Sequence, residues 1–335
     1  MNSEAKKDPA FQKIFSSGEA HFDELCMESF LFQYRHHPLY QRYCSLMQVR
    51  PEQVSRPEQI PFLPISFFKT HTVCLGEIPA SPIFESSGTT GETRSRHAIP
   101  HPEWYRESYS RGFRLFYGNP SDYRILCLVP EYRTKPESSL ACMCAGLIEQ
   151  SGHPESGFYL NDQQRLQQTL VELEQKQLPV ILIGITYALV EFAERFPVPL
   201  KSTIVMETGG MKGRRKELTR PEVHNLLEEA FARTTIHSEY GMTELLSQAY
   251  SRSGGIFNSP PWMRILIREE TDPRNITYKA KVPVRGAVNI IDLANRFSCP
   301  FIATDDAGIL HPDGSFEILG RMDNADIRGC SLMSF

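Results

Sequence analysis

Apolar side chains recur along the chain with two different periods, and the change of period separates its segments. In residues 8–47 they recur at roughly helical spacing, as in Phe22, Leu25 and Phe30, which predicts a helical segment packed on the main body. Residues 51–82 are rich in proline and predict an extended strap without regular structure, anchored by the apolar stretch Ile65–Lys69.

Short apolar runs without polar alternation predict strands that are buried on both faces. These runs are Tyr123–Val129, Val180–Gly184, Thr203–Glu207 and Thr235–Tyr240. Helices are predicted between the runs, from side-chain caps, first-turn prolines and a capping box. Their predicted starts are Pro102, Ser138 or Ser139, Asn161, Tyr187 and Thr219. The alternation predicts an α/β fold with a mostly parallel sheet flanked by helices, which binds ligands beyond the carboxyl ends of its strands.

From Trp262 onward, short alternating strands and a tight turn at Asp313-Gly314 predict a smaller β-rich subdomain. We therefore expect four parts: a helical segment (1–60), an α/β nucleotide-binding core (61–255), the β-rich subdomain (256–319) and a hinge-like tail (320–335). An aromatic stripe in the helix after Pro102 predicts core packing, with an apolar substrate tunnel as the alternative. Its members are Tyr105, Tyr109, Phe113 and Phe116.

Composition narrows the function classes. The 335 residues carry a formal net charge of −4, and no basic stripe favours nucleic acid as a partner. The polar start is unlike a signal peptide, and no apolar run has the length of a membrane span, so we expect a cytoplasmic protein that is not an integral membrane protein. Eight scattered cysteines without a Cys-x-x-Cys pair predict free thiols rather than a zinc site.

The stretch Ser86–Arg94 has the chemistry to hold a polyphosphate. Its glycines allow a turn that brings backbone N–H groups close to an anion, its hydroxyls add donors, and Arg94 adds a positive charge. The contributing residues are Ser86, Ser87, Gly88, Thr89, Thr90, Gly91 and Arg94. No Gly-Lys-Ser/Thr follows, so the stretch is not a Walker loop. A surface loop rich in serine, threonine and glycine is the alternative interpretation.

Three later motifs also have side chains suited to a nucleotide. In Tyr240–Glu244, the Tyr240 ring can stack on a base, the Thr243 hydroxyl can reach a phosphate, and the Glu244 carboxylate can hold Mg²⁺. The alternative is an ordinary strand-to-helix turn. Thr304–Gly308 places paired acids where they can bind a ribose or decorate a turn, and Gly320–Asp323 follows near the end of the chain.

Together and in this order, the four motifs resemble the adenylate-forming superfamily of acyl- and aryl-CoA ligases, luciferases and peptide-synthetase adenylation domains. The resemblance covers about residues 60–335 and implies the superfamily's large domain, with ATP and Mg²⁺ as cofactors. It implies nucleotide contacts from Thr208, Gly209, Gly210, Tyr240, Gly241, Asp306 and Arg321. Gly184–Tyr187 is similar to the acyl-site turn of phenylacetate-CoA ligases, which implies substrate contacts from Gly184, Thr186 and Tyr187.

A narrower resemblance is to acyl-protein synthetase, the fatty-acid-activating subunit of the bacterial fatty acid reductase complex known best from luminous bacteria. The phrases that carry it are Phe84–Gly91, Gly209–Lys212, Ser238–Glu244 and Asp326–Met333. It implies an acid–thiol ligase that forms an acyl-adenylate from a fatty acid, with Thr243 and Glu244 at the reacting phosphate. The acyl group would then move to Cys330 and on to a partner such as an acyl reductase or another acceptor protein.

Three departures from the superfamily pattern leave other functions open. Arg94 stands where lysine is usual, Asp305 replaces a glycine, and the small C-terminal domain with its catalytic lysine is expected to be absent. Lys212, also expected near the substrate, or Arg321 would have to supply the missing cation. The alternatives are an acyl- or aryl-CoA ligase and a non-catalytic nucleotide-binding scaffold.

Overall fold

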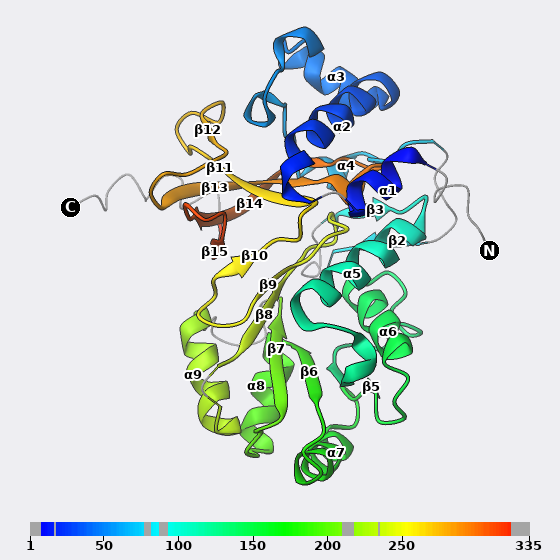
Figure 1. The fold of residues 1–335 in the computed structure, drawn as a ribbon, viewed down its shortest axis with the longest axis vertical. Helices are drawn as coiled ribbons and strands as arrows, with labels where there is room; N and C mark the ends of the chain where they lie inside the picture. The colour runs from blue at the N-terminus through cyan, green and yellow to red at the C-terminus, as the bar shows by residue number, and fades with distance from the viewer. Residues whose placement is uncertain are drawn as a thin grey trace.

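One large sheet runs through the molecule. The computed structural model describes residues 8–16, 18–76, 82–86, 93–209, 218–233 and 235–322. In this part of the chain, 13 strands form a sheet in the order β12-β11-β13-β14-β15-β10-β9-β8-β7-β6-β4-β5, with β1 paired to β14 (Figure 1). The hairpin β2 (Ile83–Glu85) and β3 (Arg96–Ala98) forms a separate two-stranded sheet.

The middle of the chain forms the parallel half of the sheet. Its strands are β4 (Arg124–Leu128), β5 (Gly157–Phe158), β6 (Val180–Ile185), β7 (Thr203–Thr208) and β8 (His237–Tyr240). Its helices are α5 (Pro102–Tyr117), α6 (Ser139–Ser151), α7 (Gln163–Gln175), α8 (Thr186–Arg195) and α9 (Arg220–Phe231). Helix α8 packs on α9 and α5 packs on α6, and Figure 1 shows these pairs on either side of the strands. The predicted α/β class is confirmed.

Local signals in the sequence explain where these helices begin. The Ser138 hydroxyl accepts from Ala141 N at 3.2 Å and caps α6, and Thr219 and Glu222 form the predicted capping box of α9. The expected Asn161 cap is wrong, because Asp162 occupies the N-cap of α7 and accepts from Arg165 N at 3.1 Å.

The later strands form the antiparallel half of the same sheet. They are β9 (Ala249–Ser251), β10 (Phe257–Asn258), β11 (Met263–Arg268), β12 (Ile276–Thr277), β13 (Val284–Asp292), β14 (Phe301–Leu310) and β15 (Phe316–Arg321). The long strands β13 and β14 pair with each other, with Val284 opposite Leu310 at one end. Their register shifts at a bulge between Ala287 and Asn289. These later strands pair antiparallel with one another, and the short strand β1 adds one parallel pairing to β14. Strand β9 joins the two halves of the sheet by pairing with β8.

The N-terminal region is helical but interrupted. It contains α1 (Pro9–Ser16), the 3₁₀ turn η2 (Glu19–His21), α2 (Phe22–His36) and α3 (Pro38–Leu46). His37 is extended, because it precedes a proline that can begin a helix but cannot continue one. The prediction of an irregular strap was wrong in part. The strap contains η3 (Pro51–Gln53), η4 (Pro57–Gln59), β1 (Leu63–Pro64) and α4 (Phe67–Thr70).

Aromatic side chains fill the space between the N-terminal helices and the sheet. Tyr105, Tyr109 and Phe113 of the predicted stripe are buried in the core, and Phe68 anchors the strap as expected. Trp104 meets the ring of Phe11 edge-on at 5.0 Å. Within the described ranges, no helix is both long and apolar enough to cross a membrane.

Candidate nucleotide and acyl-adenylate site

The predicted motifs meet where β8 ends. The turn from Tyr240 to Ser247 leaves the sheet there, next to the middle of β14 and the end of β15. The β2–β3 hairpin approaches the same turn, because His97 Nδ1 lies 2.8 Å from the Thr243 carbonyl oxygen. Four segments that are distant in the sequence thus converge at one edge of the sheet.

Tyr240, Asp306 and Arg321 form the first cluster. The Tyr240 hydroxyl donates to Asp306 Oδ2 at 2.7 Å, and Arg321 Nε lies 4.0 Å from Asp306 Oδ1. Arg321 is the cross-strand partner of Asp306, and its side chain is 76% exposed. Burial raises the pKa of Asp306, while the hydrogen bond from Tyr240 and the charge of Arg321 oppose that rise. One carboxylate oxygen thus accepts from Tyr240, and the other faces an exposed cation.

The strand alternation distinguishes the two neighbouring acids. Thr304 and Asp306 are buried, whereas Asp305 between them is exposed. The Thr304 hydroxyl donates to Val288 O at 2.8 Å and accepts from Asp306 N at 3.1 Å. These two bonds hold the backbone of β14 in place at Asp306. The geometry therefore favours Asp306 over Asp305 as the acid of this cluster.

The Tyr240 side chain is more buried than we expect of a ring that stacks on adenine. Its ring is 8% exposed and has the rings of Phe257 and Phe316 edge-on, each at 5.9 Å. Burial, together with the neighbouring Asp306 carboxylate, raises its pKa well above the ordinary range, so its hydroxyl stays protonated. Base stacking on Tyr240 stays a prediction.

Glu244 lies just beyond this cluster. It is 5% exposed, and burial raises the pKa of its carboxyl. A hydrogen bond with the Ser95 side chain and the charge of Arg321 act in the opposite direction. A single buried carboxylate can supply an oxygen ligand to a cation. Among the described residues no group of three or more His, Cys, Asp or Glu side chains could hold a metal. The Glu244 carboxylate fits Mg²⁺, which proteins often hold through one or two carboxylates and substrate phosphates.

The ends of the predicted phosphate loop are tied together. Ser86 N donates to Ser95 O at 3.0 Å, and Ser95 N donates to Ser86 Oγ at 2.9 Å. The Ser86 hydroxyl therefore closes the base of the loop. Arg94 lies 3.9 Å from Glu85, which also pairs with Arg96 at 3.4 Å. The loop residues Ser87, Gly88, Thr89, Thr90 and Gly91 lie outside the described residues.

The residues expected at the acyl site make different contacts in the structure. A Cβ at Gly184 would lie 2.6 Å from Leu189, so glycine is needed there for close packing of α8 on β6. The Thr186 hydroxyl is buried and lies 3.0 Å from the Glu207 carboxylate and 2.8 Å from the Gly209 carbonyl oxygen, either of which can accept its one hydrogen. This contact supports the end of β7. Tyr187 is half-buried. The structure thus gives Gly184 and Thr186 structural roles, and the substrate contacts of these three residues stay predictions.

Thr208 and Gly241 lie next to Glu239, a buried acid that the sequence analysis did not predict as a site residue. The Thr208 hydroxyl donates to Glu239. A Cβ at Gly241 would lie 2.5 Å from Glu239 Oε1. Gly209 has a φ of 72°, which glycine adopts without strain. Gly210, Lys212 and Cys330 lie outside the described residues.

Four residues that the sequence analysis missed hold this turn in place. Asp292 accepts from Leu246 N at 2.8 Å and from Ser247 N at 3.0 Å. The others are Ser95, His97 and Asn295. None belongs to a recognisable motif, because each acts on groups far away in sequence. The only local signal is a polar residue in an apolar run, such as Asp292 after Val288–Ile291.

Comparison with solved structures identifies the fold. A long-chain-fatty-acid–CoA ligase (FadD1) from Archaeoglobus fulgidus is 14% identical, with a TM-score of 0.51 over 75% of this chain and 53% of its own. McyG A-PCP, solved with phenylalanyl-adenylate, is 18% identical, with a TM-score of 0.51 over 82% of this chain and 44% of its own. The chain spans about half the length of such proteins. The fold is that of the adenylate-forming superfamily.

The sequence identifies the family of the chain. The family model described as "Acyl-protein synthetase, LuxE" matches residues 10–334, almost the whole chain. The chain therefore belongs to the acyl-protein synthetase (LuxE) family, as the motifs predicted. A search of curated proteins gave no match to this sequence.

Proposed function

We propose that this protein is an acid–thiol ligase that activates a fatty acid with ATP and then transfers the acyl group to Cys330. Membership of the acyl-protein synthetase family supports the proposal. The observation that carries it is the convergence of Tyr240, Asp306 and Glu244 at one edge of the sheet. Two of these residues are buried acids with raised pKa values, which is a feature typical of functional sites.

In the first step, a carboxylate oxygen of the fatty acid attacks the α-phosphorus of ATP, and pyrophosphate leaves with the electron pair of the broken P–O bond. Little covalent chemistry falls to the protein, so it acts by positioning and by stabilising charge. Asp306 would bind the ribose hydroxyls through the oxygen that Tyr240 leaves unbonded, with Arg321 beside it. Thr243 would contact the α-phosphate, and Glu244 would hold Mg²⁺, which neutralises charge on the phosphates.

The β2–β3 hairpin would hold the pyrophosphate end of the nucleotide. Ser95 contacts Glu244, so the base of the predicted phosphate loop reaches the proposed metal ligand. Arg94 is 48% exposed and only loosely paired with Glu85, which leaves it able to turn toward a phosphate. These contacts connect the loop to the turn after β8.

In the second step, the Cys330 thiolate attacks the acyl carbon of the mixed anhydride, and AMP leaves with the bonding electrons. The acyl group stays activated as a thioester. Arg328 is two residues away in sequence, and a nearby guanidinium favours the thiolate. A partner such as an acyl reductase or another acceptor protein would then take the acyl group.

The decisive experiment uses one labelling assay for each of the two steps. Fatty-acid-dependent exchange of labelled pyrophosphate into ATP tests adenylation, and hydroxylamine-labile acyl label on the protein tests transfer. Cys330→Ser should keep the exchange and lose the label, whereas Cys299→Ser, at a buried cysteine, should keep both. Absence of exchange would favour a nucleotide-binding scaffold. Exchange with acyl-CoA as the product would favour a CoA ligase.

A further inference from the structure

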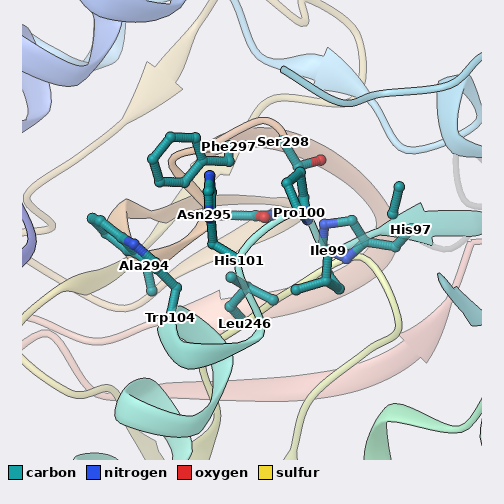
Figure 2. A pocket seen from close by; sticks show the side chains of 11 residues that line it. His97, Ile99, Pro100, His101, Trp104, Leu246, Ala294, Asn295, Phe297 and Ser298 are labelled. Carbon is teal, nitrogen blue, oxygen red and sulfur yellow. The ribbon is translucent and has the colours of Figure 1, made fainter. Parts of the chain in front are cut away.

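The short turn η6 (Leu293–Asn295) lies against the turn that carries Glu244. Asn295 Nδ2 donates to the Glu244 carbonyl oxygen at 2.7 Å, and Asp292, directly before η6, accepts from Leu246 N at 2.8 Å. Both side chains are at most 1% exposed. In Figure 2, Asn295 and Leu246 line the same small pocket. The backbone around Glu244 is therefore held by side chains from the two ends of η6.

Arg296, the residue after η6, is bound by the N-terminal segment (residues 8–16 and 18–36). Its Nε donates to Asp8 Oδ2 at 2.9 Å, and its guanidinium carbon lies 3.7 Å from the centroid of the Phe32 ring in α2. Its carbonyl oxygen accepts from Gln33 Nε2 at 2.6 Å. The side chains of Arg296 and Asp8 are only 12% and 18% exposed, so their ion pair is partly shielded from solvent.

Arg296 and Asn295 are neighbours in the chain, so their positions are linked. The peptide bond between them is planar and resists rotation. A shift of Arg296 therefore moves the backbone of Asn295, whose amide holds the Glu244 carbonyl oxygen. On the other side of Arg296, the Phe297 ring meets the Trp104 ring edge-on at 5.4 Å, so the chain after η6 is also packed in place.

A second contact connects the N-terminal segment with the same turn. The ring of Phe15, in α1, meets the Trp262 ring edge-on at 5.2 Å. The Trp262 indole nitrogen lies 3.0 Å from Ser247 Oγ, and Ser247 N donates to Asp292 at 3.0 Å. Helix α1 therefore packs on a side chain that contacts the turn directly, in addition to the link through η6.

An exposed ion pair in the N-terminal segment provides a comparison. Lys13 Nζ lies 3.1 Å from Glu28 Oε1 and joins α1 to α2, with side chains that are 54% and 45% exposed. Exposed pairs of this kind usually contribute little to stability. At Arg296, by contrast, a shielded ion pair, a cation–π contact and a backbone hydrogen bond meet on one residue. These contacts make Arg296 an attachment point between the segment and η6.

We propose that the N-terminal segment positions the turn that carries Glu244, and that Arg296 is the positioning residue through which it does so. Asp8, Phe32 and Gln33 fix Arg296, and η6 in turn holds the backbone at Glu244. The effect on activity rests on the proposed function, whereas the link between the segment and the turn does not.

Four variants separate this link from a general effect on the fold. Arg296→Met removes the charge but keeps an unbranched side chain, whereas Arg296→Lys keeps the charge. Asp8→Asn removes the opposite charge and keeps an oxygen that can accept from Ala10 N, as Asp8 Oδ1 does at 2.8 Å. Lys13→Met, which breaks the exposed ion pair between α1 and α2, is the matched control.

Amide hydrogen exchange tests the link without substrate. The two backbone N–H groups that donate to Asp292 report on the stability of the Glu244 turn. Compared at equal global stability, they should exchange roughly tenfold faster in Arg296→Met than in Lys13→Met, about the effect of one lost hydrogen bond. Asp8→Asn should show a smaller increase, because it keeps the contacts of Arg296 with α2. Equal exchange in Arg296→Met and Lys13→Met would overturn the proposal.

The Mg²⁺ requirement of pyrophosphate exchange tests the consequence for the site. In Arg296→Met, the Mg²⁺ concentration for half-maximal exchange should rise roughly tenfold, because Glu244 is the proposed ligand and its backbone is displaced. Lys13→Met should leave this concentration unchanged, and Arg296→Lys should recover most of the loss. Lower exchange with an unchanged Mg²⁺ requirement in Arg296→Met would overturn the positioning role. If the wild-type protein lacks pyrophosphate exchange, the proposed function fails, while the amide measurement still decides this inference.

Discussion

The two faces of strands β7 and β8 carry buried glutamates with opposite surroundings. Glu207 faces α9, where Arg220 Nε lies at 3.5 Å and His224 Nε2 at 3.7 Å. Glu239 faces α5 and β9, where the Thr208 hydroxyl is its hydrogen-bond donor and tyrosines and cysteines surround it. Both side chains are almost fully buried.

The difference in partners reverses the effect of burial. Burial alone would raise the pKa of Glu207, but hydrogen bonds with His224 and Ser238 and the charge of Arg220 lower it overall. Burial raises the pKa of Glu239 to about 7, and Glu207 adds to the rise. Glu244 and Asp306, which belong to the proposed site, also have raised pKa values. The partners of Glu207 thus offset its burial, whereas the raised pKa values of the other buried acids are a feature typical of functional sites.

The largest expected effect is at Glu244, a buried acid with a raised pKa at the proposed site. Glu244→Gln should lower Mg²⁺-dependent pyrophosphate exchange by about a thousandfold or more, because an amide binds a dication poorly. The melting temperature should stay near that of the wild type, since glutamine keeps the shape of the side chain. Glu269→Gln, at an exposed position, is the control. Near-normal exchange in Glu244→Gln would contradict the Mg²⁺ assignment.

On the paired side, Arg220→Ala should destabilise the fold by about 4 kcal/mol, because it leaves a buried carboxylate without its cation. The change also removes a 2.8 Å hydrogen bond to Ile318 O and a guanidinium that lies 5.1 Å from the Phe257 ring centroid. Denaturant unfolding measures the loss. Arg220→Lys, which keeps the charge, should lose less. A loss below about 1 kcal/mol would show that His224 alone satisfies Glu207.

Sequence patterns predicted the parallel half of the fold well because its signals are local. Unbroken apolar runs marked β4, β6 and β7, and caps marked α6 and α9. The strap was missed because proline suits short 3₁₀ turns as well as extended chain. The continuity of the sheet from β8 into β9 and β10 was missed too, since pairing between such short strands leaves no periodic pattern.

The site was predictable to the extent that its residues follow strand ends. Tyr240 and Glu244 were marked on that ground, Asp306 was marked by the family resemblance, and the structure brings the three together. Residues that support the site through backbone carbonyls or amides, such as Asn295 and Asp292, gave no signal. Their role depends on long-range contacts that only the folded chain creates.

Glu239 makes the comparison of the two faces testable by pH. Its pKa of about 7 in the folded protein exceeds the unfolded value of about 4.5. Its contribution to stability is therefore complete below about pH 4.5 and is lost as the pH rises through about 7. Glu239→Gln should remove this dependence of stability on pH. For a pKa shift of this size, the change in the free energy of unfolding amounts to roughly 3 kcal/mol. Unfolding measured from pH 5 to 8 checks it, and equal slopes in both proteins would contradict the assignment.

The smallest effect concerns the acid that Tyr240 and Arg321 share. Asp306→Asn should weaken ATP binding by about 2 kcal/mol, roughly thirtyfold in Kd, because a buried acceptor for ribose hydroxyls loses its charge. Asp305→Asn is the matched control, since Asp305 is exposed and adjacent in the strand. Calorimetric titration with ATP and Mg²⁺ compares the two variants. If Asp305→Asn weakened ATP while Asp306→Asn did not, the ribose would bind on the opposite face of β14. The bond from the Tyr240 hydroxyl to Asp306 would then be structural, like the pairing of Glu207.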